Sequence, residues 1–112
     1  MAITHYVVLT AASPGRQQEF EHWYDERHLD DVVAVEGVRS ATRFRILSQN
    51  VSGIDAPQWC SLAIYDIDAD DPEAVVARIS ATAGSAAMPT SEALSRDGLV
   101  RLLVGKVSEA AA

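Results

Sequence analysis

The chain has 112 residues, of which 48% are hydrophobic and 22% charged, and its formal net charge is −7. Its length suits one domain over residues 1–112, and its composition excludes an intrinsically disordered chain. The acidic balance argues against a nucleic-acid partner, and no apolar run approaches the roughly 20 residues that span a membrane. A single cysteine, Cys60, and no recognisable signal peptide favour a cytoplasmic protein.

The first half of the chain predicts a strand, a helix and a second strand. Residues 3–10 (ITHYVVLT) are rich in β-branched and aromatic side chains, which favour a strand. Ser13 followed by Pro14 is typical of a helix start, because a hydroxyl caps free amides and proline suits the first turn. We expect this helix to run from Pro14 to the late twenties, or as far as Val35, before a strand over 38–47.

The second half of the chain predicts one more helix between two strands. Asp71 followed by Pro72 marks a second helix start, and apolar side chains at helical spacing continue through Ala83. The flanking segments are a polar loop over 48–57, a strand over 58–67, a loop over 85–98 and a last strand over 99–107.

The resulting β-α-β-β-α-β order predicts an α+β, ferredoxin-like sandwich, with four antiparallel strands and both helices on one face. The sheet carries apolar residues on both faces, since Val7 and Leu9 alternate with Tyr6 and Val8 along the first strand. Two helices cover only one face, so the other must be buried against something, most simply a second copy of the chain. We therefore predict a homodimer.

The first helix carries ionisable residues on the face predicted to point inward. The residues within about 60° of Tyr24 on a helical wheel are Phe20, Arg27, His28 and Asp31, with Trp23 at the edge. A helix that only covers a sheet is expected to carry Leu or Val at such positions. Because buried polar groups need partners, the pattern indicates a cavity whose walls are the neighbouring aromatic residues.

A plainer interpretation of the same helix is also open. If the helix bends near His28, Arg27 and Asp31 reach solvent, and His28 only interacts with carbonyl groups at the helix end. Trp23 and Tyr24 are then ordinary core aromatics.

The segment from Phe20 to Phe44, FEHWYDERHLDDVVAVEGVRSATRF, resembles the EthD-like members of the dimeric α+β barrel superfamily. These proteins share W-Y-x-x-x-H on a helix, a few hydrophobic residues, a glycine and an A-x-R-F strand. The resemblance implies a sheet-to-sheet dimer with one small-molecule cavity per subunit, into which His28 points. Where the family usually has a proline two residues after the histidine, this chain has Asp30, so the end of the helix need not follow the family's shape.

The activities within this group are diverse. The resemblance implies cofactor-free chemistry of the kind found in polyketide cyclases and dehydratases, muconolactone-type isomerases and quinone-forming monooxygenases. Other members have no known activity, so the resemblance is more specific for a fold than for a reaction.

The second and third strands offer further candidates for the cavity. Arg43 shares a strand face with other arginines, which either protect an edge strand against aggregation or anchor an acidic group of a substrate or of the dimer partner. Tyr65 and Trp59 lie on one face of the third strand and would extend the cavity wall.

Other catalytic constellations are missing from the sequence. It has no glycine-rich phosphate loop, and the three histidines lack a metal-ligand spacing. Cys60, in the middle of a strand, is more typical of a small core residue than of a nucleophile. We expect no metal and no cofactor.

His28 and Tyr24, one helical turn apart, are our candidate catalytic residues. An imidazole works as acid or base near neutral pH, and a tyrosine hydroxyl orients it or donates to a developing enolate oxygen. The candidate substrate-binding residues are Trp23, Phe20, Arg43, Tyr65 and Asp31. These residues predict a cofactor-independent lyase, isomerase or cyclase acting on a small aromatic or polyketide-like carbonyl compound. The alternatives are a cofactor-free monooxygenase of a phenolic substrate and a non-catalytic binding protein for a hydrophobic metabolite.

Overall fold

The computed structural model describes residues 3–112 and confirms the β-α-β-β-α-β order. Its strands are β1 (Thr4–Ala12), β2 (Val38–Arg45), β3 (Ser61–Ile67) and β4 (Leu94–Gly105). The first helix is continuous and consists of α1 (Gln17–Trp23), the π-helical turn η1 (Tyr24–His28) and α2 (Leu29–Val33). The second helix is α3 (Pro72–Thr82).

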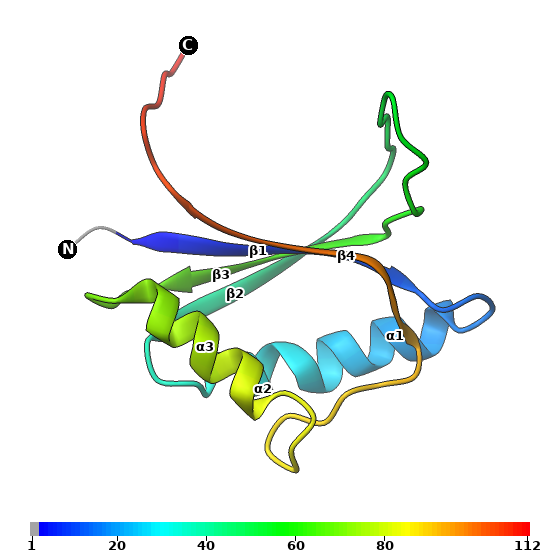
Figure 1. Ribbon diagram of the computed structural model, residues 1–112, viewed down its shortest axis with the longest axis horizontal. Coiled ribbons are helices and arrows are strands. Elements are labelled where there is room, and N and C mark those ends of the chain that lie inside the picture. Colours follow the sequence, from blue (N-terminus) through cyan, green and yellow to red (C-terminus); the bar gives the residue numbers. More distant parts are fainter. Residues whose placement is uncertain (1–2) are drawn as a thin grey trace.

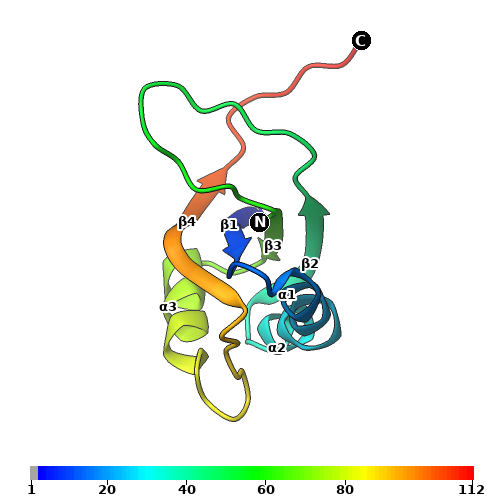
Figure 2. The same cartoon turned by 90° about the vertical axis from the view of Figure 1, so that its right-hand side faces the viewer.

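The four strands form one sheet in the order β2-β3-β1-β4, in which every adjacent pair is antiparallel. The two helices lie side by side against one face of this sheet (Figures 1 and 2). The predicted α+β, ferredoxin-like architecture is therefore confirmed. Among the described residues, no helix is long and apolar enough to cross a membrane.

The two helix starts that the sequence suggested differ in outcome. Asp71 caps α3 as predicted, because its side chain accepts a hydrogen bond from the Ala74 amide at 3.2 Å. The prediction for Ser13 was wrong: α1 begins only at Gln17 and has no side-chain cap. The Ser13 hydroxyl instead donates to the Glu92 carbonyl at 2.7 Å, which ties the start of the first helix to the start of β4.

The strand limits differ from the prediction mainly where pairing with a distant strand decides them. β4 begins at Leu94 rather than at residue 99, because Leu94 and Ser95 pair with the end of β1 beyond a register shift. β3 begins at Ser61 rather than at residue 58. β2 and β4 each end two residues before the predicted 47 and 107.

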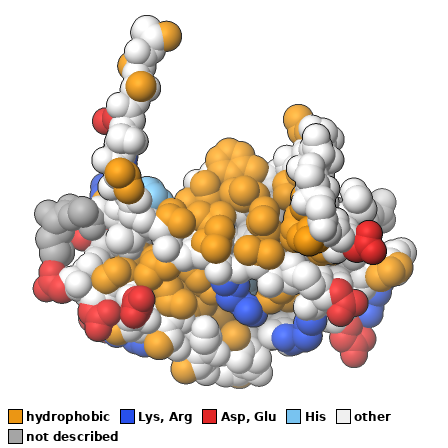
Figure 3. All heavy atoms as spheres, turned by 45° about the horizontal axis from the view of Figure 1, so that its top comes forward, with side chains coloured by type: hydrophobic (Ala, Val, Ile, Leu, Met, Phe, Trp, Pro, Cys, Tyr) orange, Lys and Arg blue, Asp and Glu red, His pale blue; other side chains and the backbone are white. Residues whose placement is uncertain are grey.

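The hydrophobic core lies between the helices and the face of the sheet that carries Tyr6, Val8, Ala63 and Tyr65. The opposite face is uncovered and apolar, and it forms the central hydrophobic surface in Figure 3. Phe44 on this face is 51% exposed. Two segments, residues 46–60 and 106–112, project on either side of it and are named the arms below (Figure 1).

Candidate functional site

A cavity of about 370 Å³ lies between the sheet and the helices. Side chains of β1, β3 and β4 form one wall, and Trp23, Tyr24 and His28 of the first helix form another. The end of α3 and the loop after it complete the lining with Ser80 and Thr90. This volume is within the usual range for small-molecule sites, at its lower end.

His28 is packed among aromatic rings on the wall of this cavity. Its ring stacks on Trp23, with centroids 4.5 Å apart and planes 24° apart, and meets the edge of Tyr24 at 5.1 Å. The Trp23 indole in turn donates to the Pro89 carbonyl at 3.1 Å, which fixes it against the loop after α3. The imidazole is therefore held in one orientation by ring contacts rather than by hydrogen bonds.

The π-helical turn explains how Trp23 and His28 come to stack. On an ideal α-helix, residues five apart lie about 140° away from each other. Here the Leu29 amide bonds to the Tyr24 carbonyl, five residues back, so the helix is widened by one residue over this turn. The widened turn brings Trp23 and His28 to the same side. A regular helical wheel, which places Trp23 at the edge of the inward face, cannot show this.

Burial keeps the His28 imidazole neutral. Loss of hydration lowers the pKa of His28 to about 4, and the nearby charge of Asp31 opposes this only in part. Its Nδ1 atom is buried and has no hydrogen-bond partner among the described residues. A neutral imidazole has one donor and one acceptor nitrogen, and a ligand in the cavity meets the part of the His28 ring that lines it.

Two tyrosine hydroxyls meet deeper in the site. The hydroxyl of Tyr65 lies 3.5 Å from that of Tyr24, and both residues are buried and line the cavity. Burial raises the pKa of both hydroxyls, so each remains a protonated donor at neutral pH. The buried hydroxyl of Thr10 lines the same cavity and has no partner among residues 3–112. The Tyr24 hydroxyl thus faces Tyr65 rather than the imidazole of His28.

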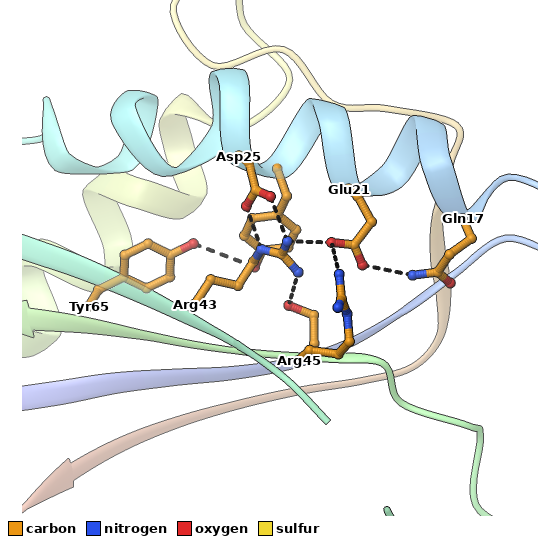
Figure 4. Close-up of polar contacts among 8 residues, drawn as sticks. Gln17, Glu21, Asp25, Arg43, Arg45 and Tyr65 are labelled. Carbon is orange, nitrogen blue, oxygen red and sulfur yellow. Dashed lines mark hydrogen bonds and ion pairs between the residues drawn. The ribbon is translucent and has the colours of Figure 1, made fainter. Parts of the chain in front are cut away.

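Arg43 lies outside the cavity and is engaged by the first helix. Its guanidinium bonds both oxygens of Asp25, at 2.7 and 2.8 Å, and also pairs with Glu21 (Figure 4). Asp25 and then Glu21 hold the pKa of Arg43 above its usual range. Its guanidinium carbon lies 5.3 Å from the centre of the Tyr24 ring. Arg43 therefore packs against the ring of Tyr24 outside the cavity, and its guanidinium is already paired with two carboxylates.

The structure also keeps Phe20 and Asp31 out of the cavity lining. Phe20 is fully buried and packs edge to face on Tyr24, at 5.4 Å between centroids, as a core residue. Asp31 pairs with Arg27 at 2.8 Å in a separate hollow near Val35. The candidate residues that the structure brings together are therefore Trp23, Tyr24, His28 and Tyr65.

The fold of the chain is similar to that of a solved EthD family protein from Bacillus halodurans. The similarity covers 94% of this chain and 99% of that chain, with a TM-score of 0.54 and 15% sequence identity. The chain has an EthD-like fold. This confirms, at the level of the fold, the resemblance seen in the Phe20–Phe44 segment. No protein-family model and no curated protein sequence matches the chain.

Within the EthD-like fold of this chain, two arginines of the cavity were not predicted from the sequence. Arg96 and Arg101 of β4 both line it. Arg101 interrupts the apolar run LVRLLV of a strand, which is a signal that the sequence does contain. Arg96 lies in the segment 94–98 that was predicted as a loop, so its direction could not be inferred from strand alternation.

Proposed function

We propose that the protein is a cofactor-independent lyase, isomerase or cyclase that moves a proton on a small aromatic or polyketide-like carbonyl compound. The observation that carries this proposal is the neutral His28 imidazole, which lines the cavity and is stacked on Trp23 beside the paired hydroxyls of Tyr24 and Tyr65. Such polar groups are costly to bury unless a ligand uses them.

In the proposed reaction, His28 takes a proton from the carbon next to a carbonyl group. The hydroxyls of Tyr24 and Tyr65 donate hydrogen bonds to the oxygen on which negative charge develops. Return of the proton to a different carbon completes an isomerisation. Its transfer to a hydroxyl group that leaves as water completes a dehydration. In an aldol-type ring closure the enolate carbon bonds to a second carbonyl carbon, and the proton goes to the alkoxide oxygen that forms. Trp23 holds the imidazole by stacking and provides an aromatic surface for the substrate. A positioned acid or base of this kind contributes roughly 10²–10⁴-fold to a rate.

We also propose that the functional form is a homodimer joined through the uncovered sheet face. This face exposes Phe44, Leu102 and Val104, and each arm adds an almost fully exposed side chain, Leu47 (91%) and Val107 (96%). Apolar surface of this extent is typical of an interface. Its covering by a second copy would leave the cavity, on the other side of the sheet, open to substrate. The lone Cys60 suits a reducing compartment such as the cytoplasm.

Proton exchange with solvent tests the proposed reaction without knowledge of the substrate. The protein would be incubated in D2O with a panel of small aryl and polyketide-like ketones, and deuterium at the carbon next to the carbonyl measured by NMR. We expect exchange above background that His28→Ala abolishes. His22→Ala is the matched control, because His22 is an exposed histidine of the same helix. Equal exchange by wild type and His28→Ala for every ketone would contradict the role of His28.

One observation favours a non-catalytic binding protein as the second candidate. A base whose pKa is about 4 accepts protons from carbon weakly at neutral pH, whereas the neutral ring still suits a ligand hydrogen bond. A binding protein would return a ligand with unchanged mass and no deuterium after long incubation.

A further inference from the structure

The cavity has a positively charged opening in a protein that is acidic as a whole. Arg96 and Arg101 line the cavity and are also exposed to solvent, so they lie where it opens. No Asp or Glu of the described residues lines it. The formal net charge of the chain is −7, so a cavity whose charged lining residues are two arginines is a local departure from the surrounding charge.

Arg96 and Arg101 also differ from three other arginines of the chain, which are paired with carboxylates. Arg16, Arg27 and Arg43 each form an ion pair with a carboxylate of the first helix or of a nearby loop. Within residues 3–112, neither Arg96 nor Arg101 has an ion-pair or hydrogen-bond partner among the side chains. Their guanidinium groups are free to bind an anion from outside the chain.

An irregularity of β4 directs both side chains to the cavity. In a regular strand, residues five apart point to opposite faces. Here the pairing of β4 with β1 shifts register between Leu9 and Ala11, and Gly98 has a positive φ of 68° within the shifted stretch. The Trp59 indole donates to the Gly98 carbonyl at 2.7 Å and holds this stretch in place. The shift allows Arg96 and Arg101 to line one cavity.

We propose that the ligand of this cavity carries an anionic group, a carboxylate, which Arg101 and Arg96 bind at the opening while its aromatic part lies against Trp23 and His28. This inference rests on the proposed function, because it names the substrate class of the same site. A planar guanidinium matches a carboxylate with two parallel hydrogen bonds, and the opening leaves the charged group partly hydrated.

A bound anion would also change His28. The negative charge of a carboxylate at the opening favours the protonated imidazole and so opposes part of the lowering of the His28 pKa that burial causes. Ligand binding would thereby bring a weak base closer to the match with neutral pH. The same carboxylate would supply affinity and strengthen the base.

Binding of matched aromatic probes tests the proposal. Titration calorimetry would compare 2-naphthoate with the uncharged 2-naphthamide, and with 2-naphthyl phosphate as a second anion. We expect the full-length protein to bind naphthoate about tenfold more tightly than naphthamide, with a preference that weakens as salt increases. Arg101→Gln should remove most of the preference, by weakening the binding of naphthoate far more than that of naphthamide. Arg39→Gln, an exposed arginine outside the cavity lining, is the matched control.

Three other outcomes would each contradict a different part of the proposal. Equal affinity for naphthoate and naphthamide, or no binding of either at millimolar concentration, would overturn the anion proposal. Much tighter binding of the phosphate would overturn the carboxylate in favour of a phosphate ester. An unchanged preference in both Arg101→Gln and Arg96→Gln would show that the arginines are not the cause. None of these results depends on deuterium exchange, so failure of the proposed reaction is detected separately.

Discussion

Two arginines on the opposite edge strands β2 and β4 show how the surroundings decide what a charged residue can do. Arg43 is enclosed by Asp25 and Glu21, one helical turn apart on the first helix, and its side chain is only 9% exposed. Arg101 faces a cavity without carboxylates. From the sequence, Arg43 was a candidate anion anchor because it shares a strand face with other arginines, an arrangement that also suits the protection of an edge strand. The carboxylates that bind Arg43 come from the helix, and their approach depends on the packing of helix on sheet.

His28 makes the stability of the fold dependent on pH. Its pKa is about 4 in the folded protein and about 6.5 when exposed, so below pH 6.5 the unfolded chain binds the proton more readily. Stability from this group is therefore complete above pH 6.5 and is lost as the pH falls toward 4. We expect wild type to lose about 2 kcal/mol more than His28→Gln between pH 7.5 and pH 5, measured by urea unfolding.

The comparison with a second variant isolates this effect. His22→Gln removes an exposed histidine of the same helix and should follow wild type, since the carboxylates are unchanged in all three proteins. If His28→Gln and wild type lose the same free energy over this range, the imidazole is not buried as the structure shows it.

At the scale of single elements, the irregular stretch of β4 is held by contacts with the arm at residues 46–60. Gly98 has a positive φ, and a side chain there would also collide with the ring of Pro57. Gly53 has a similar φ of 83°, but a side chain there would meet nothing. We expect Gly98→Ala to destabilise the protein by at least about 1 kcal/mol more than Gly53→Ala, measured by thermal or urea unfolding.

The difference between the two alanine variants matters more than either value. In each variant the alanine must adopt a positive φ, which costs roughly 1 kcal/mol of stability, so only the collision with Pro57 distinguishes the two variants. Equal destabilisation would mean that the arm does not pack against β4 at this point.

The elements that the sequence predicted well are those with local signals. Asp71 and Pro72 define the start of α3 through contacts within one turn, and the β-branched and aromatic residues of 3–10 identify β1. The start of β4 at Leu94 and the role of Ser13 depend on pairing with residues about 80 positions away along the chain, which local patterns do not contain. The π-helical turn that stacks His28 on Trp23 escapes a helical wheel for the same reason: the wheel assumes one periodicity throughout.

At the scale of the whole molecule, the two faces of the sheet serve different purposes. The covered face and the helices enclose the cavity, whereas the uncovered face exposes Phe44, Leu102 and Val104. This face forms the central hydrophobic surface in Figure 3. His5 and Asp66 lie on the same face as a pair at 2.6 Å, so this surface is apolar with one polar pair at its side. A monomer would leave this apolar face exposed to water, which is unusual for a domain of this size.

The oligomeric state tests whether the uncovered face of the sheet is the interface between two copies. Phe44→Glu places a carboxylate in the proposed interface of both subunits, where it is repelled by its symmetry mate and loses hydration. We expect wild type to sediment at micromolar concentration as a particle of twice the 12.1 kDa chain mass, and Phe44→Glu to sediment as a monomer. Because Phe44 is half exposed in one chain, the variant should keep its far-UV circular dichroism. Val33→Glu makes the same charge change at an exposed apolar residue of the first helix and should remain dimeric. A wild-type monomer, or a dimer that Phe44→Glu leaves intact, would mean that the uncovered face is not where two copies meet.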